Sequence, residues 1–103
     1  MSRTISISLR HQLGQPVAME RIRALSDQIK TKYADRVTVK WELQSEYSLD
    51  FGIEVLKQTI TGSIEVERNV VVAVVQLPFM LSLLSRRVKV LLEQHIQKAL
   101  QLT

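Results

Sequence analysis

Near the start of the chain, the spacing of apolar residues changes from a period of two to a helical period. Between residues 4 and 10, Ile5, Ile7 and Leu9 alternate with polar residues, which is typical of a strand with one face in water. Pro16 suits the first turn of a helix, where its missing N–H needs no partner. The apolar residues that follow recur every three or four positions, which predicts an amphipathic helix. They are Ala18, Ile22, Leu25, Ile29 and Tyr33.

The period of two then returns three times and is followed by a continuous apolar run, which together predict four more strands. They cover about residues 37–43, 47–55, 60–66 and 70–75. Arg68 and Asn69 suit the tip of a hairpin, because Asn tolerates positive φ. The segment 70–75 is apolar at every position, so this strand is either buried on both faces or lies beneath a partner. The pattern leaves open which of its two faces points away from the helices.

After Pro78 the apolar residues follow a helical period almost to the end of the chain. A broad stripe is expected to face the core: Leu81, Leu84, Val88, Leu91, Leu92, His95, Ala99 and Leu102. Phe79, Leu83 and Val90 lie roughly opposite this stripe. The helix therefore offers two apolar surfaces, and only one of them can face its own sheet.

The order strand, helix, four strands, helix predicts an α+β fold in one domain, residues 1–103. We expect a single antiparallel sheet of about five strands with two helices packed on one face. The first strand has no hairpin partner, so we expect it beside the fifth. Because the fifth strand would then expose valines on the face without helices, a homodimer is the expected assembly.

Composition and charge narrow the classes of function. The chain has no Cys, which excludes thiol catalysis and Cys-based zinc sites. It has neither a secretory signal pattern nor an apolar run long enough for a transmembrane segment, so a cytoplasmic protein is expected. The net charge is +4, and the segment after Pro78 contains four bases but only one acid, Glu93. That excess forms either an ordinary solvated helix face or a surface for an anionic lipid or partner.

No motif in the sequence predicts catalysis or a cofactor. The two histidines, His11 and His95, have no metal-ligand spacing, and the three glycines form no phosphate-binding loop. A structural role is favoured for His95 over that of a catalytic base, and His11 either caps the first helix or contacts a ligand. Nucleic-acid binding is not favoured, because the strand aromatics share the inward parity and the outward charges there are mostly acidic.

The order of short motifs along the chain resembles that of the small putative polyhydroxyalkanoic acid system proteins of bacteria. The motifs are His11-x-Leu13-Gly14, Val39-x-Trp41, Leu49-x-Phe51, Gly62-x-Ile64-x-Val66, Leu77-Pro78-Phe79 and the basic amphipathic C-terminal helix. The resemblance implies association with polyhydroxyalkanoate storage granules. It brings no catalytic residues with it.

Two hypotheses for the function follow. The first is a non-catalytic accessory protein that binds the polyhydroxyalkanoate granule surface, or a granule-associated protein, through an apolar and basic face. The residues of that face are Phe79, Leu83, Arg86, Arg87, Lys89 and Val90. The alternative is a protein, or an accessory enzyme, that binds a small hydrophobic ligand such as a hydroxyacyl or fatty acyl group in a pocket between sheet and helices. The candidate pocket residues are His11, Trp41, Phe51 and Gly62.

Overall fold

The computed structural model describes residues 3–55 and 57–101. The elements follow the predicted order, strand, helix, four strands and helix, with a short 3₁₀ helix before the last helix. They are β1 (Arg3–Arg10), α1 (Gln15–Lys32), β2 (Thr38–Ser45), β3 (Ser48–Val55), β4 (Gln58–Val66), β5 (Val70–Leu77), η1 (Phe79–Leu84) and α2 (Ser85–Leu100).

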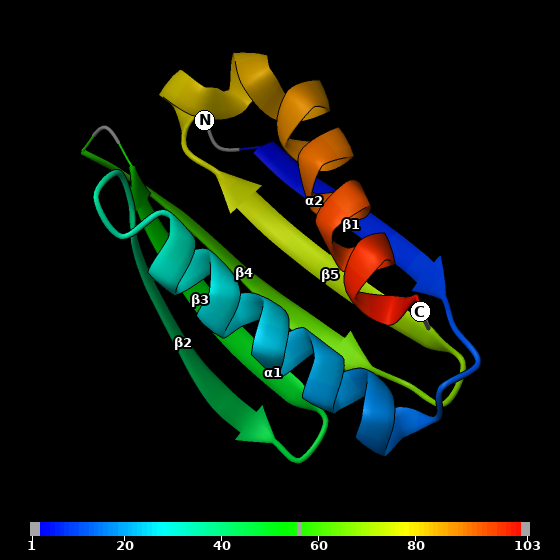
Figure 1. The fold of residues 1–103 in the computed structure, drawn as a ribbon. Helices are drawn as coiled ribbons and strands as arrows, with labels where there is room; N and C mark the ends of the chain where they lie inside the picture. Colours follow the sequence, from blue (N-terminus) through cyan, green and yellow to red (C-terminus); the bar gives the residue numbers. More distant parts are fainter. Residues whose placement is uncertain (1–2, 56, 102–103) are drawn as a thin grey trace.

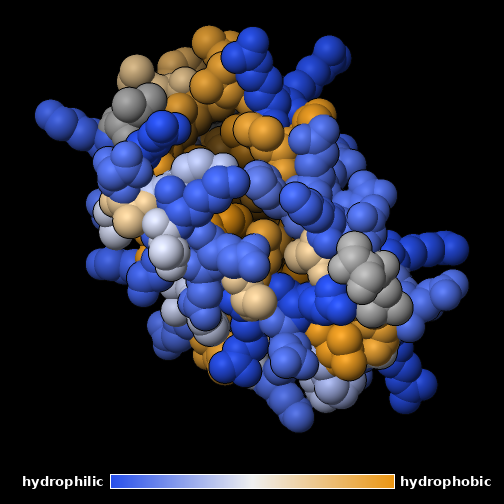
Figure 2. Space-filling view, in the orientation of Figure 1, coloured by the Kyte–Doolittle hydropathy of each residue, from blue (hydrophilic) through white to orange (hydrophobic). Residues whose placement is uncertain are grey.

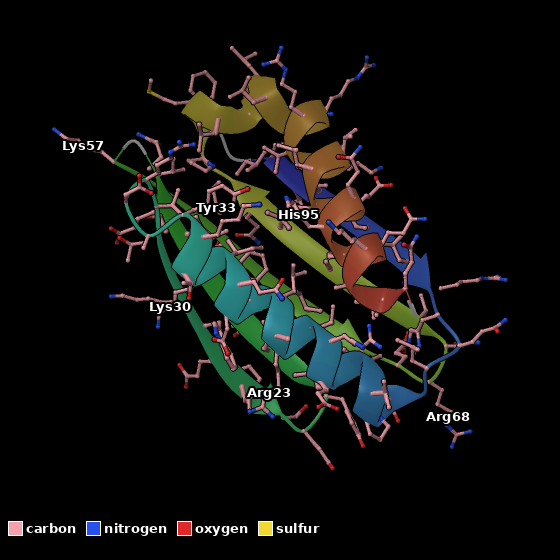
Figure 3. All side chains as sticks on the ribbon, viewed as in Figure 1. Arg23, Lys30, Tyr33, Lys57, Arg68 and His95 are labelled. Atoms are coloured by element: carbon pink, nitrogen blue, oxygen red, sulfur yellow. The ribbon has the colours of Figure 1, made fainter. Side chains whose placement is uncertain are left out.

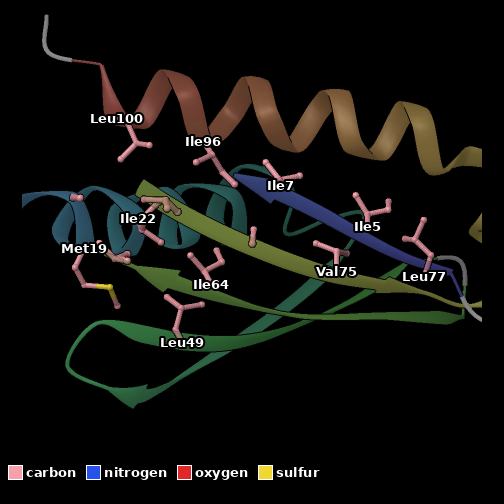
Figure 4. Packing of buried hydrophobic residues seen from close by; sticks show 14 residues of the cluster. Ile5, Ile7, Met19, Ile22, Leu49, Ile64, Val75, Leu77, Ile96 and Leu100 are labelled. Atoms are coloured by element: carbon pink, nitrogen blue, oxygen red, sulfur yellow. The ribbon is translucent and has the colours of Figure 1, made fainter. Parts of the chain in front are cut away.

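The five strands form one antiparallel sheet in the order β1-β5-β4-β3-β2 (Figure 1). This confirms the predicted α+β fold and the placement of the first strand beside the fifth. Ile7 of β1 is paired with Ala73 of β5, and β4 lies on the other side of β5. Both helices cover the same face of the sheet, and the buried side chains lie between the two layers (Figure 4).

The start of α1 depends on two residues with special backbone conformations, a glycine and a proline. Gly14 has φ 79° and ψ 159°, a conformation open essentially only to glycine, and it turns the chain from β1 into the helix. Pro16 lies in the first turn, as predicted. The helix then buries Ala18, Met19 and Ile22 against the sheet. Its polar side remains in water.

The two faces of β5 differ, which answers the question that the sequence left open. Val71, Ala73, Val75 and Leu77 face the helices and are buried. Val70, Val72 and Val74 point to the other face and are only half-buried. We call that second face, which no described helix covers, the open face of the sheet.

The predicted core stripe of the last helix is partly wrong. Leu84 and Leu91 are 45% and 54% exposed, whereas Ser85, Ile96 and Leu100 are buried. Leu91 lies within α2 and is exposed because that helix buries its Ser85, Ile96 and Leu100 side instead. For Leu84 the reason is that residues 79–84 form a 3₁₀ helix. It has 3.0 residues per turn instead of 3.6, so each residue shifts the helical phase by about 20°. Val88 and Leu92 pack against the core as predicted, and Leu102 lies outside the described residues.

Candidate functional site

Most of the exposed large hydrophobic side chains gather in one place, over η1 and the first half of α2. Six of the eight in the described structure lie there. They are Phe79, Met80, Leu83, Leu84, Val90 and Leu91. Figure 2 shows hydrophobic side chains at this end of the molecule. Together with Arg86, Arg87 and Lys89, we call these residues the η1–α2 surface.

The 3₁₀ helix explains why so many apolar side chains face outward here. Pro78 ends β5, and its carbonyl oxygen accepts a hydrogen bond from the Leu81 N–H at 2.9 Å. The Ser82 hydroxyl donates to the carbonyl oxygen of Phe79 at 2.6 Å, which closes the turn. Leu81 packs against the core in this geometry, while Phe79 and Leu83 are 68% and 93% exposed.

The bases of this surface are adjacent to its apolar residues and free to act on a partner. Arg86, Arg87 and Lys89 are exposed. A shallow hollow on the surface of α2 is lined by Arg86, Arg87, Val90 and Leu91. Among residues 3–55 and 57–101 the only ion pair joins Asp35 to Arg36, so none of the three bases forms an ion pair with a described carboxylate. The surface combines apolar anchors with unpaired positive charge.

Sequence reasoning identified six of these nine residues but missed Met80, Leu84 and Leu91. Met80 could have been found from the sequence, because it directly follows Phe79, a residue of the predicted surface. Leu84 and Leu91 belong to the predicted core stripe, which treats the segment after Pro78 as one continuous helix. No local pattern distinguishes a 3₁₀ turn from an α-helical turn in the segment 79–84.

Three of the four predicted pocket residues lie side by side in the sheet. Trp41, Phe51 and Gly62 are consecutive partners across β2, β3 and β4. A Cβ on Gly62 would lie 2.5 Å from Cζ of Phe51, so the phenyl ring packs directly over the glycine. The Trp41 indole N–H donates to Asp27 of α1 at 3.2 Å, which ties the sheet to that helix.

His11 lies outside this row of paired residues and is held by the backbone. Its Nδ1 accepts a hydrogen bond from the Leu13 N–H at 3.2 Å, and its Nε2 lies 3.0 Å from the carbonyl oxygen of Glu67. The first bond requires an unprotonated Nδ1, so Nε2 carries the proton and donates. His11 is buried and connects the loop after β1 to the end of β4. Its ligand role stays a prediction.

Two further findings concern the described residues as a whole. No group of three or more His, Asp or Glu side chains there is arranged to hold a metal ion. No described helix is long and apolar enough to cross a membrane.

Comparison with known families identifies the chain. Residues 5–100 match the sequence model of a family described as putative polyhydroxyalkanoic acid system protein. The chain belongs to this family. The match covers every described helix and all but the first residues of β1, so the matched region includes the residues of both the sheet and the η1–α2 surface.

Other comparisons add little to the family assignment. No curated protein matches the sequence significantly. Among solved structures, the crystal structure of the Zhui aromatase/cyclase from Streptomyces sp. R1128 is similar over 76% of this chain and 68% of that chain. The identity is 8% and the TM-score is 0.41.

Proposed function

We propose that this protein is a non-catalytic accessory protein of the polyhydroxyalkanoate storage system. It works in the cytoplasm and binds the granule surface, or a protein located there, through the η1–α2 surface. The observation that carries the proposal is the concentration of six exposed apolar side chains beside three unpaired bases. Family membership supplies the storage system as the setting.

The chemistry of the η1–α2 surface suits a coated apolar particle. Burying a Phe or Leu side chain contributes about 1.5–3 kcal/mol. Each base near an anionic surface adds about 1 kcal/mol. Since Phe79 and Leu83 are mostly exposed, they can transfer to a partner without leaving the core. An interface of this kind needs no catalytic group.

We expect the double variant Phe79→Gln/Leu83→Gln to be released from granules. Both apolar anchors would be lost, which should weaken binding about a hundredfold or more. The fold should persist, because the two side chains are 68% and 93% exposed. Granules are sedimented from a granule-forming host, and the bound and free protein fractions are quantified.

The matched control is Val17→Gln/Leu43→Gln. These two side chains are also exposed, 40% and 43%, but lie outside the η1–α2 surface. This variant should remain on granules at wild-type levels. The proposal fails if the Phe79/Leu83 variant stays bound, or if both double variants are released equally. Circular dichroism of each variant confirms that it is folded.

Self-association through the open face of the sheet is a second part of the proposal. Val74 lies between Ser6 of β1 and Ser63 of β4, and Val72 lies between Ser8 and Glu65. The serines are small, so a second sheet can approach the valine row closely. A two-fold dimer would stack the two open faces and leave both η1–α2 surfaces free.

Light scattering at high micromolar concentration should therefore report a dimer. Val74→Lys should give a monomer, because a two-fold axis would bring two added ammonium groups into one interface at the cost of their desolvation. Thr31→Lys adds the same charge on the exposed side of α1 and should stay dimeric. A monomeric wild-type protein would refute this part of the proposal.

A further inference from the structure

A cleft runs between α1 and α2 on the side of the molecule that carries the helices. Its volume is about 410 Å³, within the range of about 300–1,000 Å³ that is typical of small-molecule sites. Figure 2 shows the hollow between the two helices, with hydrophobic side chains at its floor. The cleft is lined by none of the pocket residues expected from the sequence, and it lies apart from the η1–α2 surface.

The walls of the cleft are apolar and its rim is cationic. Leu25 and Ile29 of α1 and Ala99 of α2 contribute apolar surface. Lys32 and Lys98 lie at the rim on opposite helices, and both are exposed. No Asp or Glu is among the lining residues, although the chain contains ten acidic residues. The cleft thus favours a ligand with an apolar body and a negative group.

The two ends of the cleft differ. At one end, the Arg21 guanidinium donates to the carbonyl oxygens of Ala99 and Gln101, at 3.3 and 3.0 Å, and ties α1 to the C-terminus of α2. Farther along the gap, Tyr33 and His95 project from opposite sides (Figure 3). Within the described part of the chain, neither the Tyr33 hydroxyl nor the His95 ring has a hydrogen-bond partner. Both are therefore available to a ligand.

We infer that this cleft binds a straight-chain carboxylic acid. The alkyl chain lies between the helices against Leu25, Ile29 and Ala99, and the carboxylate lies at the rim within reach of a lysine. Charge complementarity selects this ligand, since an alcohol of the same length would use only the apolar walls and a cationic amphipath would be repelled. The inference does not depend on granule binding.

Calorimetric titration with sodium decanoate, below its critical micelle concentration, tests the inference. One molecule should bind per chain. Ala24→Trp should weaken binding at least tenfold, because Ala24 lines the cleft from an exposed position and the indole would occupy it. Val17→Trp, on the same helix but outside the cleft, should bind decanoate as the wild type does. If Ala24→Trp does not fold, Gln28→Trp at a second exposed lining position replaces it.

A charge-matched pair tests the rim. Lys32→Gln/Lys98→Gln should weaken decanoate binding about three- to tenfold, because whichever of the two lysines the carboxylate contacts is then neutral. Lys30→Gln/Lys40→Gln has the same net charge but changes bases outside the cleft, and its affinity should be unchanged. Decanol should bind more weakly than decanoate, and decyltrimethylammonium more weakly still.

Three results would overturn the inference: no decanoate binding at millimolar concentration, equal affinity for the cationic amphipath, or unchanged affinity in the Trp variant that fills the cleft. The result is separable from the proposed function. Ala24→Trp should still associate with granules, and Phe79→Gln/Leu83→Gln should still bind decanoate.

Discussion

Replacing Leu49 by alanine should lower the free energy of unfolding by about 2–5 kcal/mol. Leu49 lies on β3, is fully buried, and is paired across the sheet with Ile64 of β4. Removing its side chain beyond Cβ leaves a cavity between the sheet and the helices that the surrounding residues cannot fill completely. The loss is a large share of the roughly 5–15 kcal/mol that stabilises a typical domain. Equilibrium unfolding in urea, followed by circular dichroism, measures it.

Leu83→Ala is the control for this measurement, because it deletes the same atoms from a side chain that is 93% exposed. Its effect on the free energy of unfolding should stay within about 0.5 kcal/mol. If the two variants unfold at the same urea concentration, the assignment of Leu49 to the core is wrong. The same control shows that Leu83 is available for the granule experiment without a cost in stability.

Ile96→Ala should also destabilise the protein strongly, by about 2–5 kcal/mol, whereas Leu91→Ala should cost less than about 1 kcal/mol. The side chain of Ile96, on the buried side of α2, is 3% exposed, and that of Leu91, on the outer side of the same helix, is 54% exposed. The pair therefore reports which face of α2 meets the sheet. Urea unfolding of the two variants side by side gives both values.

The reverse order of effects, with Leu91→Ala the more damaging, would restore the stripe that a continuous helix from Pro78 predicts. It would also remove Leu91 from the η1–α2 surface. A third outcome, equal losses in both variants, would place both residues in partial contact with the core and contradict the observed exposure of Leu91.

Strand positions and their order were predictable from sequence because their cause is local. Successive side chains of a strand point to opposite faces, so alternation such as Ile5-Ser6-Ile7 reports both the strand and its buried face. Short connections favour antiparallel neighbours, which places β2 to β5 in one meander. The absence of a hairpin partner then left β1 beside β5. The exposed residues Phe79, Leu83 and Val90 were found in the same way, from their position opposite an apolar stripe.

The tertiary structure alone decided three other features. Residues 79–84 form a 3₁₀ helix, which leaves Leu84 out of phase with α2, and α2 buries its Ile96 side and leaves Leu91 exposed. The direction of the valines in β5 depended on which face the helices cover. The cleft depends on the spacing between α1 and α2, which are far apart in the sequence.

Sequence therefore determined the elements, the fold class and the apolar and basic character of the C-terminal surface. The packing of two helices on one sheet decided which side chains of α2 and β5 are buried, and it created the cleft between Lys32 and Lys98. The physical reason is that hydrophobic periodicity acts within one element. Helix phase and the distance between helices depend on contacts between elements, and no local pattern encodes those contacts.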